Sequence, residues 1–270
     1  MNIKTEQDMQ KFAKSVKRFH LTSPFLVYTS DGSNPEEISV WEAKNQEMIQ
    51  RGIIGAGSHL QQGIDWITSD SSGVRIREVP FLYPSGKLLS GYPHLTGPMT
   101  GNLSNCYDPL RKLILFHMRG TNIAAPFGFQ AAAAGMGRFR EHPAETAKKE
   151  LVEEAGLKYA AYLFSGRAVD CLPFMKGGKI PQPLFSFGFE NCLEQFPVCR
   201  SLDDVAQFEA AIKKQLTEKT IEQREGYHFT LPLKAVETIA GQLNDSKRFY
   251  GPIYESTINF LRALRDGRLV

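Results

Sequence analysis

The sequence predicts a mixed α/β protein, and two observations carry this prediction. After about residue 100, apolar segments typical of strands alternate with helical patterns; the strand-like segments are KLILFHM at Lys112, YAAYLFS at Tyr159 and PLFSFGF at Pro183. Two amphipathic helices are then expected, over residues 203–216 and 254–264, each with one apolar stripe. Strands that alternate with helices favour a layered arrangement of helices on a mixed sheet.

The first hundred residues predict a smaller α/β region. Residues 6–18 have helical spacing, FLVYTS at Phe25 is typical of a strand, and DGSNPEE has the composition of a turn. A helix is expected from Ala43 to near Gly52, followed by a glycine-rich turn. Glycine and proline are densest over residues 90–101, so we place a boundary there, between an N-terminal region (1–98) and a second domain (99–270).

Composition excludes several classes of protein. A hydrophobic content of 42% is sufficient for a sizeable core, and a net charge of only +3 without a basic run argues against a nucleic-acid partner. The sequence contains neither a signal-peptide core nor a membrane-spanning stretch, so we expect a cytoplasmic protein. The cysteines have no zinc or disulfide spacing and are expected to be free: Cys106, Cys171, Cys192 and Cys199.

One helix has unusually clear boundaries. Pro143 suits a first helical position, Glu145 suits the positive N-terminal end, and Gly156 suits a left-handed terminator, so a helix is expected from Pro143 to Ala155. Ala147, Leu151 and Ala155 form its buried stripe.

Three glutamates on an adjoining face of this helix are placed to meet. Glu150, Glu153 and Glu154 stand at i, i+3 and i+4, where like charges repel by a few tenths of a kcal/mol per pair. Two interpretations are open from these residues alone. Lys148 and Lys149 offset the charge as ordinary surface partners, or a hard divalent cation such as Mg²⁺ takes the carboxylates as ligands.

The residues upstream extend the pattern. GMGRFREHPAETAKKELVEEAGL, from Gly135 to Leu157, contains a glycine, five residues, Glu141, eight residues and then ELVEEAGL. It resembles the Nudix box, the signature of the Nudix hydrolase superfamily. Six matched positions are Gly or Glu, and at about 7% usage of each a chance match is on the order of 10⁻⁷ per starting position. The resemblance covers about residues 100–270 and implies an α/β/α sandwich with a mixed sheet there. It does not extend to the smaller N-terminal α/β region that precedes this part of the chain.

Three positions depart from the family pattern. Lys149 replaces the usual arginine, which keeps the charge and loses the planar fork. Ala134 stands in the middle of the usual Pro-Gly-Gly entry, so a loop with less steric freedom is expected there. Arg140 replaces a glycine that often precedes the box glutamate.

The resemblance implies a hydrolase of the pyrophosphate linkage in a nucleoside diphosphate joined to another group. Mg²⁺, with Mn²⁺ as a substitute, would be held by Glu150, Glu153 and Glu154, with Glu141 and the backbone carbonyl of Ala134 as further ligands or supports. A cation is needed because an anionic diphosphate repels hydroxide.

The family pattern leaves the catalytic side chains partly open. Lys149 is expected to orient a glutamate by a charge-assisted hydrogen bond. The general base is open among Glu150 and two residues of the late segment IEQREGYHF, Glu222 and Glu225. The same segment is expected to lead into a strand.

Substrate identity is the least determined. Arg119 and Arg138 are candidates to pair with phosphates, with solvent exposure as the alternative. Phe129 is a candidate to stack on a nucleobase, with core packing as the alternative. Pro173 stands near the distance at which ADP-ribose hydrolases of the family carry a proline, so ADP-ribose or a nucleotide sugar is the expected small-molecule nucleotide substrate.

Two alternatives to this enzyme are open, and the first belongs to a different class. A nucleotide-sensing or regulatory protein would keep the fold with little or no catalysis, and an enzyme acting on RNA would need a basic and aromatic patch that the sequence lacks. The N-terminal region has three open roles: packing on the catalytic domain, shaping the substrate entrance, or forming a homodimer.

Overall fold

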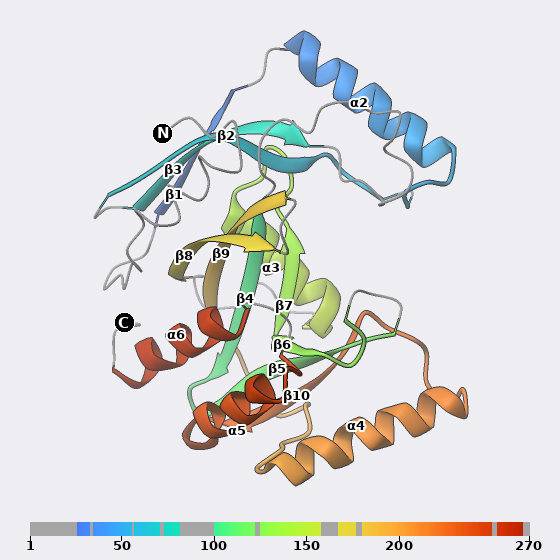
Figure 1. Ribbon diagram of the computed structural model, residues 1–270, viewed down its shortest axis with the longest axis vertical. Coiled ribbons are helices and arrows are strands. Elements are labelled where there is room, and N and C mark those ends of the chain that lie inside the picture. The colour runs from blue at the N-terminus through green and yellow to red at the C-terminus, as the bar shows by residue number, and fades with distance from the viewer. Residues whose placement is uncertain are drawn as a thin grey trace.

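A three-stranded sheet and one helix form the N-terminal region. The computed structural model describes residues 26–32, 35–55, 57–70, 73–81, 100–121, 125–157, 167–176, 180–249 and 253–266. The first elements are β1 (Leu26–Asp31), α2 (Pro35–Gln50), β2 (Gln61–Asp70) and β3 (Gly73–Phe81). β3 is central, parallel to β1 and antiparallel to β2. Figure 1 shows α2 at the top of the molecule, beside this sheet.

A second, seven-stranded mixed sheet forms the body of the protein. Its strands are β4 (Gly101–Asp108), β5 (Leu113–Arg119), β6 (Phe129–Ala131), β7 (Ala133–Met136), β8 (Arg167–Lys176), β9 (Ile180–Glu190) and β10 (Gly226–Pro232). The order is β10-β5-β4-β9-β8, with β6 paired to β5 and β7 paired to β4. β4 and β9 are parallel, and the other pairs are antiparallel.

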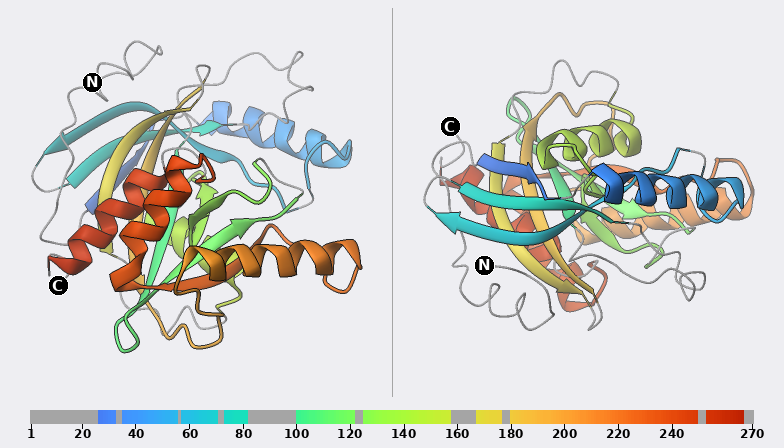
Figure 2. Two further views of the ribbon diagram at one scale, coloured as in Figure 1. Left: turned by 60° about the horizontal axis from the view of Figure 1, so that its bottom comes forward. Right: turned by 90° about the horizontal axis from the view of Figure 1, so that it is seen from above.

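Helices cover both faces of this sheet. They are α3 (Pro143–Ala155), α4 (Leu202–Thr217), α5 (Leu233–Asp245) and α6 (Ile253–Arg265). Along β5, Leu113 and Leu115 belong to the core cluster with α3, whereas Ile114, Phe116 and Met118 belong to the cluster with α4, α5 and α6. This alternation follows from the two-residue period of a strand. The result is a three-layer α/β/α arrangement, with α5 and α6 in front of the sheet in the left view of Figure 2.

The predicted mixed α/β fold is confirmed, and so are the helices expected over residues 143–155, 203–216 and 254–264. The turn expected at DGSNPEE is wrong in part, because α2 begins at Pro35 rather than at Ala43. Proline at the first helical position and glutamates in the first turn favour that earlier start. α5 was not predicted, although Val236, Ile239, Ala240 and Leu243 are buried at helical spacing.

Some sequence predictions lie outside the described residues. They are the helix over 6–18, the strand at Tyr159 and most of the boundary segment 90–101. The division into two domains stays a prediction. Ile64 of β2 and Ile76 of β3 pack in the same core cluster as α3, so the N-terminal sheet shares apolar contacts with the larger body.

Two composition-based predictions can be compared with the described part of the chain. None of the helices there combines the length and the apolar character that crossing a membrane requires. Cys106, Cys192 and Cys199 are free thiols, as expected, and Cys192 alone of these three is exposed.

The loop between β7 and α3 contains a strained residue. Arg140 adopts φ 62°, in the left-handed region that favours glycine. This explains the glycine that the family pattern often has at this position. Arg140 is held there because its backbone N–H donates to Glu78 at 3.1 Å and its guanidinium pairs with Asp31 at 3.0 Å. Ala134 has no such strain: it lies in β7, so the expected restricted loop at that position is wrong.

Replacement of Arg140 by glycine and by alanine separates backbone strain from the lost ion pair. Both variants lose the pair with Asp31, but only alanine keeps the strain, which costs a non-glycine residue about 1–2 kcal/mol. We therefore expect Arg140→Gly to exceed Arg140→Ala by about 1 kcal/mol in the free energy of unfolding, measured by urea denaturation. An alanine variant as stable as the glycine variant would contradict the assigned conformation.

Candidate active site

The local sequence around α3 accounts for how this helix is held. His142 Nδ1 accepts a hydrogen bond from the Ala144 N–H at 3.1 Å, and Gly156 terminates the helix at φ 63°. Ala147, Leu151 and Ala155 are buried, as predicted. Because this apolar stripe is buried, the adjoining face of α3 that carries the glutamates lies against β7, where the box begins.

The three glutamates on α3 occupy different environments. The side chains of Glu150 and Glu154 are 16% and 8% exposed, and that of Glu153 is 57% exposed. Burial, followed by repulsion from Glu154, raises the pKa of Glu150 to about 7. A Cβ atom on Gly135 would lie 2.2 Å from Glu150 Cδ, so this box position must be glycine for Glu150 to occupy its place.

Arg138 bridges two of these carboxylates. Its Nη2 lies 3.4 Å from Glu150 Oε1 and 3.1 Å from Glu153 Oε2. In this arrangement the residue predicted to pair with phosphate pairs with the glutamates instead. The chain thereby supplies a cation of its own between carboxylates that would otherwise repel each other.

Glu141 and Lys149 form a second ion pair beside the first. Lys149 Nζ contacts Glu141 Oε2, and Thr146 Oγ1 donates to Glu141 Oε1 at 2.8 Å. Burial acts to raise the pKa of Glu141, but the hydrogen bonds from Lys149 and Thr146 outweigh it, and the pKa lies below its usual value. The expected pairing of Lys149 with a glutamate is present, and its catalytic role stays a prediction.

Sequence reasoning missed a row of three polar side chains across the sheet. Gln130 of β6, His117 of β5 and His228 of β10 occupy adjacent positions in register. Each is a polar residue inside a mostly apolar strand, which was the available signal. His228 Nε2 contacts the Ala132 carbonyl at 2.7 Å, and burial, with the neighbouring His117, lowers its pKa to about 3.

The hydrogen bonds of this row assign the protonation of His117. Arg119 Nη1 donates to Gln130 Oε1 at 2.7 Å, which directs Gln130 Nε2 to donate to His117 Nδ1 at 3.1 Å. Burial lowers the pKa of His117 to about 4, so the ring is neutral near pH 7 and carries its proton on Nε2. His117 Nδ1 therefore has no proton to donate to Glu154.

Glu154 is consequently a buried carboxylate with an unsatisfied oxygen. Its Oε2 lies 3.1 Å from His117 Nδ1 but has no hydrogen-bond partner among the described residues. Burial, followed by repulsion from Glu225, raises the pKa of Glu154 to about 8. Either a proton or a cation on Oε2 would satisfy this group.

Two glycines bring the late loop against this row. A Cβ atom on Gly226 would lie 1.4 Å from His117 Nε2, and one on Gly120 would lie 1.9 Å from the Arg224 carbonyl oxygen. The close approach lets the Glu225 carbonyl accept from the Gly120 N–H at 2.7 Å and from His117 Nε2 at 3.3 Å. The charge of Glu225 acts on Glu154, whereas the backbone carbonyl of Glu222 accepts a hydrogen bond from the Tyr227 hydroxyl at 3.2 Å.

Three further predicted residues have other surroundings than expected. Arg119 donates to Gln130 rather than facing an open phosphate site, and the Ala134 backbone donates a hydrogen bond to Glu154. Phe129 is fully buried, edge-on to Phe229 at 5.9 Å between ring centroids. Core packing therefore accounts for Phe129, and its ring offers no face to a nucleobase.

The donor set fits a hard divalent cation chemically, because it consists of carboxylates and includes the unsatisfied Glu154 Oε2. In the part of the chain that is described, however, no three His, Cys, Asp or Glu side chains are gathered closely enough to hold an ion. Arg138 pairs with Glu150 and Glu153, and Lys149 pairs with Glu141. The metal set stays a prediction.

Hydrogen bonds from the N-terminal sheet hold the loop that carries Glu141. Gln62 Nε2 donates to Glu78 Oε2 at 2.8 Å and to the Glu141 carbonyl at 3.1 Å, and the Gln62 N–H donates to the Gly137 carbonyl. Thr100 Oγ1 completes this buried network at 3.0 Å from Gln62 Oε1. The N-terminal region therefore contributes directly to the position of a box glutamate.

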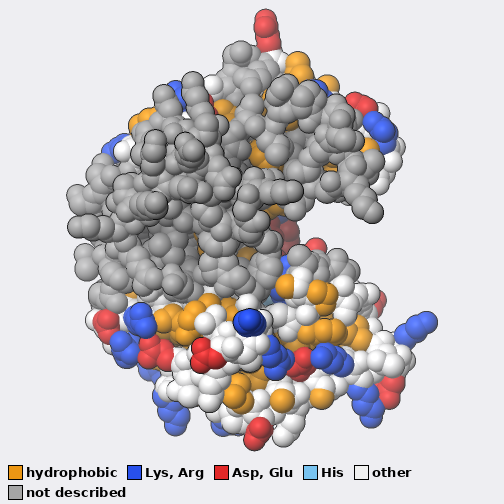
Figure 3. Space-filling view, viewed as in Figure 1, with side chains coloured by type: hydrophobic (Ala, Val, Ile, Leu, Met, Phe, Trp, Pro, Cys, Tyr) orange, Lys and Arg blue, Asp and Glu red, His pale blue; other side chains and the backbone are white. Residues whose placement is uncertain are grey.

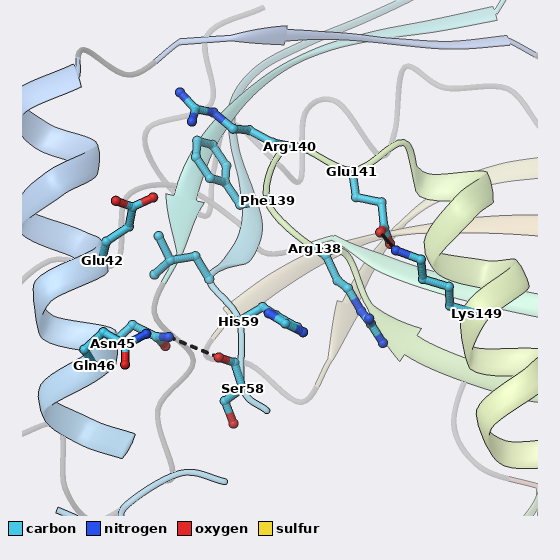
Figure 4. Close-up of a pocket in the computed structure, with 11 residues that line it drawn as sticks. Glu42, Asn45, Gln46, Ser58, His59, Arg138, Phe139, Arg140, Glu141 and Lys149 are labelled. Carbon is cyan, nitrogen blue, oxygen red and sulfur yellow. Dashed lines mark hydrogen bonds and ion pairs between the residues drawn. The ribbon is translucent and has the colours of Figure 1, made fainter. Parts of the chain in front are cut away.

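The surface of the molecule is hollowed on the side where α2 and α4 end, and Figure 3 shows charged side chains on the inner wall of this hollow. A cavity of about 380 Å³ lies between α2 and residues 138–141. Figure 4 shows Glu141 and Lys149 at one side of that cavity and Glu42 and Asn45 at the other.

Comparison with protein-family models finds no match, and comparison with curated proteins finds none. Solved structures give distant similarities. DR0079 from Deinococcus radiodurans has 11% identity and a TM-score of 0.43 over 75% of this chain and 98% of that chain. The E. coli dihydroneopterin triphosphate pyrophosphohydrolase has 15% identity and a TM-score of 0.34 over 52% and 84%. The Nudix hydrolase RenU from M. smegmatis has 12% identity and a TM-score of 0.34 over 63% and 86%. Identities and TM-scores this low carry no conclusion about the function of this chain.

The raised pKa of Glu154 predicts a pH-dependent cost in stability. Between the ordinary pKa of 4.5 and the folded-state value of about 8, the folded protein holds a proton that the unfolded chain releases, so stability falls as pH rises. In EDTA we expect Glu154→Gln to match the wild type near pH 4.5 and to exceed it at pH 8 by up to about 4 kcal/mol, at about 1.4 kcal/mol per pH unit.

Urea unfolding at the two pH values measures this difference. If the stabilities of the wild type and of Glu154→Gln differed equally at both values, the carboxyl of Glu154 would not titrate in this window.

Proposed function

We propose that this chain is a divalent-cation-dependent hydrolase of the Nudix type, which cleaves the pyrophosphate linkage of a nucleoside diphosphate joined to another group. The observation that supports it most is the unsatisfied, buried Glu154 Oε2 beside Glu150, on the helix that matches the Nudix box. Two crowded carboxyl groups with pKa values of about 7 and 8 are costly to bury in their ionised form, and a bound cation would offset that cost.

The residues that would hold Mg²⁺ or Mn²⁺ are Glu150, Glu153 and Glu154, with Glu141 and the Ala134 carbonyl as further ligands or supports. A bound cation of this kind neutralises diphosphate oxygens and acidifies water. Arg138 then exchanges its glutamate partners for phosphate oxygens, for which its planar guanidinium is suited.

Glu225 is the residue that we propose takes the proton from the attacking water. Its backbone carbonyl accepts hydrogen bonds from Gly120 and His117, and its charge acts on Glu154. Glu222 stands three residues earlier in the same loop and directs its carbonyl to Tyr227. The two glutamates therefore form a matched pair for testing the general base.

The decisive experiment measures product release from nucleoside diphosphate compounds, including ADP-ribose and nucleotide sugars, with Mg²⁺ and with EDTA. We expect turnover of at least one compound with Mg²⁺ and none with EDTA. Glu225→Gln should lower kcat by about 10²- to 10⁴-fold, the range for loss of a general base, and Glu222→Gln should leave kcat within about twofold. Equal kcat values for the two variants would remove Glu225 from the mechanism.

Gly135 offers a test of the carboxylate geometry itself. In Gly135→Ala the new methyl group would displace the flexible end of Glu150, so we expect stability to change little and Mg²⁺ binding to weaken by about 10- to 100-fold. Gly57→Ala is the control, because a Cβ atom there meets nothing within 4 Å. Titration calorimetry with Mg²⁺ measures the effect, and unchanged affinity in Gly135→Ala would exclude Glu150 as a ligand.

A second candidate function is a nucleotide-binding sensor with little or no catalysis. It is favoured by the position of Arg138, which already occupies the space between Glu150 and Glu153. Nucleotide binding without turnover of any compound would decide for the sensor.

A further inference from the structure

A second cavity, of about 510 Å³, lies at the far end of the strands that lead to the α3 glutamates. β5 and β10 pair from Leu113 with Pro232 at this end to Arg119 with Gly226 at the end beside the late loop. The four residues from Leu113 to His117 span about 13 Å of extended chain. This cavity is therefore separate from the site described above.

Three apolar side chains line the cavity where α5 meets α6. Pro232 and Leu233 come from the start of α5, and Leu261 comes from α6, which packs beside α5 in the left view of Figure 2. The surface that faces the cavity is mostly apolar, because the aliphatic stems of long cationic side chains add to these three. Its volume lies in the range of pockets that hold small organic ligands, about 300–1,000 Å³.

Four cationic side chains and one carboxylate also line the cavity. Arg111 pairs with Asp108 at 3.4 Å and contacts Glu194 as well. Arg265 pairs at 3.0 Å with the lining carboxylate, that of Glu237. The chain therefore neutralises both arginines itself.

The other two cations, Lys112 and Lys234, are not neutralised in this way. Both are exposed, and neither forms an ion pair with a described residue. The Leu233 N–H donates to the Lys112 carbonyl at 2.8 Å, so the two lysines stand at the same end of the cavity. α5 begins there without a side-chain cap or an acidic residue in its first turn, so its positive end adds to their charge. An anionic group on a ligand would be complementary to this end.

The lining favours an aliphatic ligand with one negative charge. None of the described residues that line the cavity is aromatic, so a nucleobase would find no ring to stack on. The planar forks of the two arginines, which suit phosphate, are already paired, whereas a lysine acts as a point charge. Two such point charges beside an apolar surface suit a carboxylate on a hydrocarbon chain.

We propose that this cavity binds a medium-chain aliphatic carboxylate. The chain of the ligand packs on Pro232, Leu233 and Leu261, and its carboxylate accepts hydrogen bonds from the ammonium groups of Lys112 and Lys234. The inference goes beyond the proposed function and does not depend on it, because no residue of this cavity belongs to the site at α3.

Titration calorimetry in EDTA tests the site with three probes: octanoate, 1-octanol and acetate. The chelator prevents a metal ion from holding the carboxylate at α3. We expect octanoate to bind at least about tenfold more tightly than either of the other two, because it alone has both the chain and the charge. Lys234→Gln should weaken octanoate binding by about tenfold, through loss of a charged hydrogen bond, and should leave 1-octanol binding unchanged.

Lys214→Gln is the matched control, since Lys214 is an exposed lysine on α4 that does not line the cavity. Leu233→Ala should weaken octanoate and 1-octanol alike, because it removes part of the apolar wall. Unfolding midpoints report whether each variant is intact. Three results would overturn the proposal: no binding of octanoate, binding of acetate or 1-octanol as tight as that of octanoate, or equal losses in Lys234→Gln and Lys214→Gln.

An anionic membrane surface is the alternative occupant of this face. Leu110, next to Arg111 in the β4–β5 turn, is 87% exposed and could enter a lipid layer. Retention of the wild type on vesicles of anionic phospholipid, lost in Leu110→Ser, together with no binding of octanoate would assign the face to a membrane and overturn the small-ligand site. Octanoate binding that is unchanged in Leu110→Ser would uphold it.

Discussion

The site depends on the cost of removing carboxylates from water. Glu150 and Glu154 stand four residues apart on α3 and are both largely buried. Desolvation raises the pKa of both carboxyls, and the charge of Glu154 raises that of Glu150 further. On a helix that only covers a sheet, glutamate side chains would lie in solvent. Because these two carboxylates are buried, the neighbouring groups must either neutralise their negative charge or leave space for a ligand that does.

The chain meets this demand with its own donors at three of four carboxylates. Arg138 lies between Glu150 and Glu153, and Lys149 contacts Glu141. Glu154 is the exception, because the Arg119–Gln130–His117 hydrogen bonds turn a lone pair of His117 toward it. A row of neutral polar groups thus leaves one buried carboxylate oxygen without a hydrogen-bond donor among the described residues.

The N-terminal region takes part in the site rather than standing apart from it. Gln62 binds the backbone on both sides of residues 138–140, and Phe139 inserts into the small core under α2. The strained backbone at Arg140 is held by Glu78 and Asp31 of the same region. The N-terminal region therefore positions Glu141 and also forms one side of the cavity.

The sequence by itself determined what local signals control. Pro143, Glu145 and Gly156 act within one turn of a helix end, so α3 and the order of its glutamates were predicted correctly. The row of Gln130, His117 and His228 was decided by strand register between segments far apart in the chain, and no local pattern specifies such register. For the same reason, the sequence alone could not distinguish the roles of Glu225 and Glu222. It also could not show that Phe129 packs in the core and is not exposed to a ligand. The position of α2 beside the cavity was likewise not predictable from the sequence, because it depends on how the N-terminal region packs against the rest of the chain.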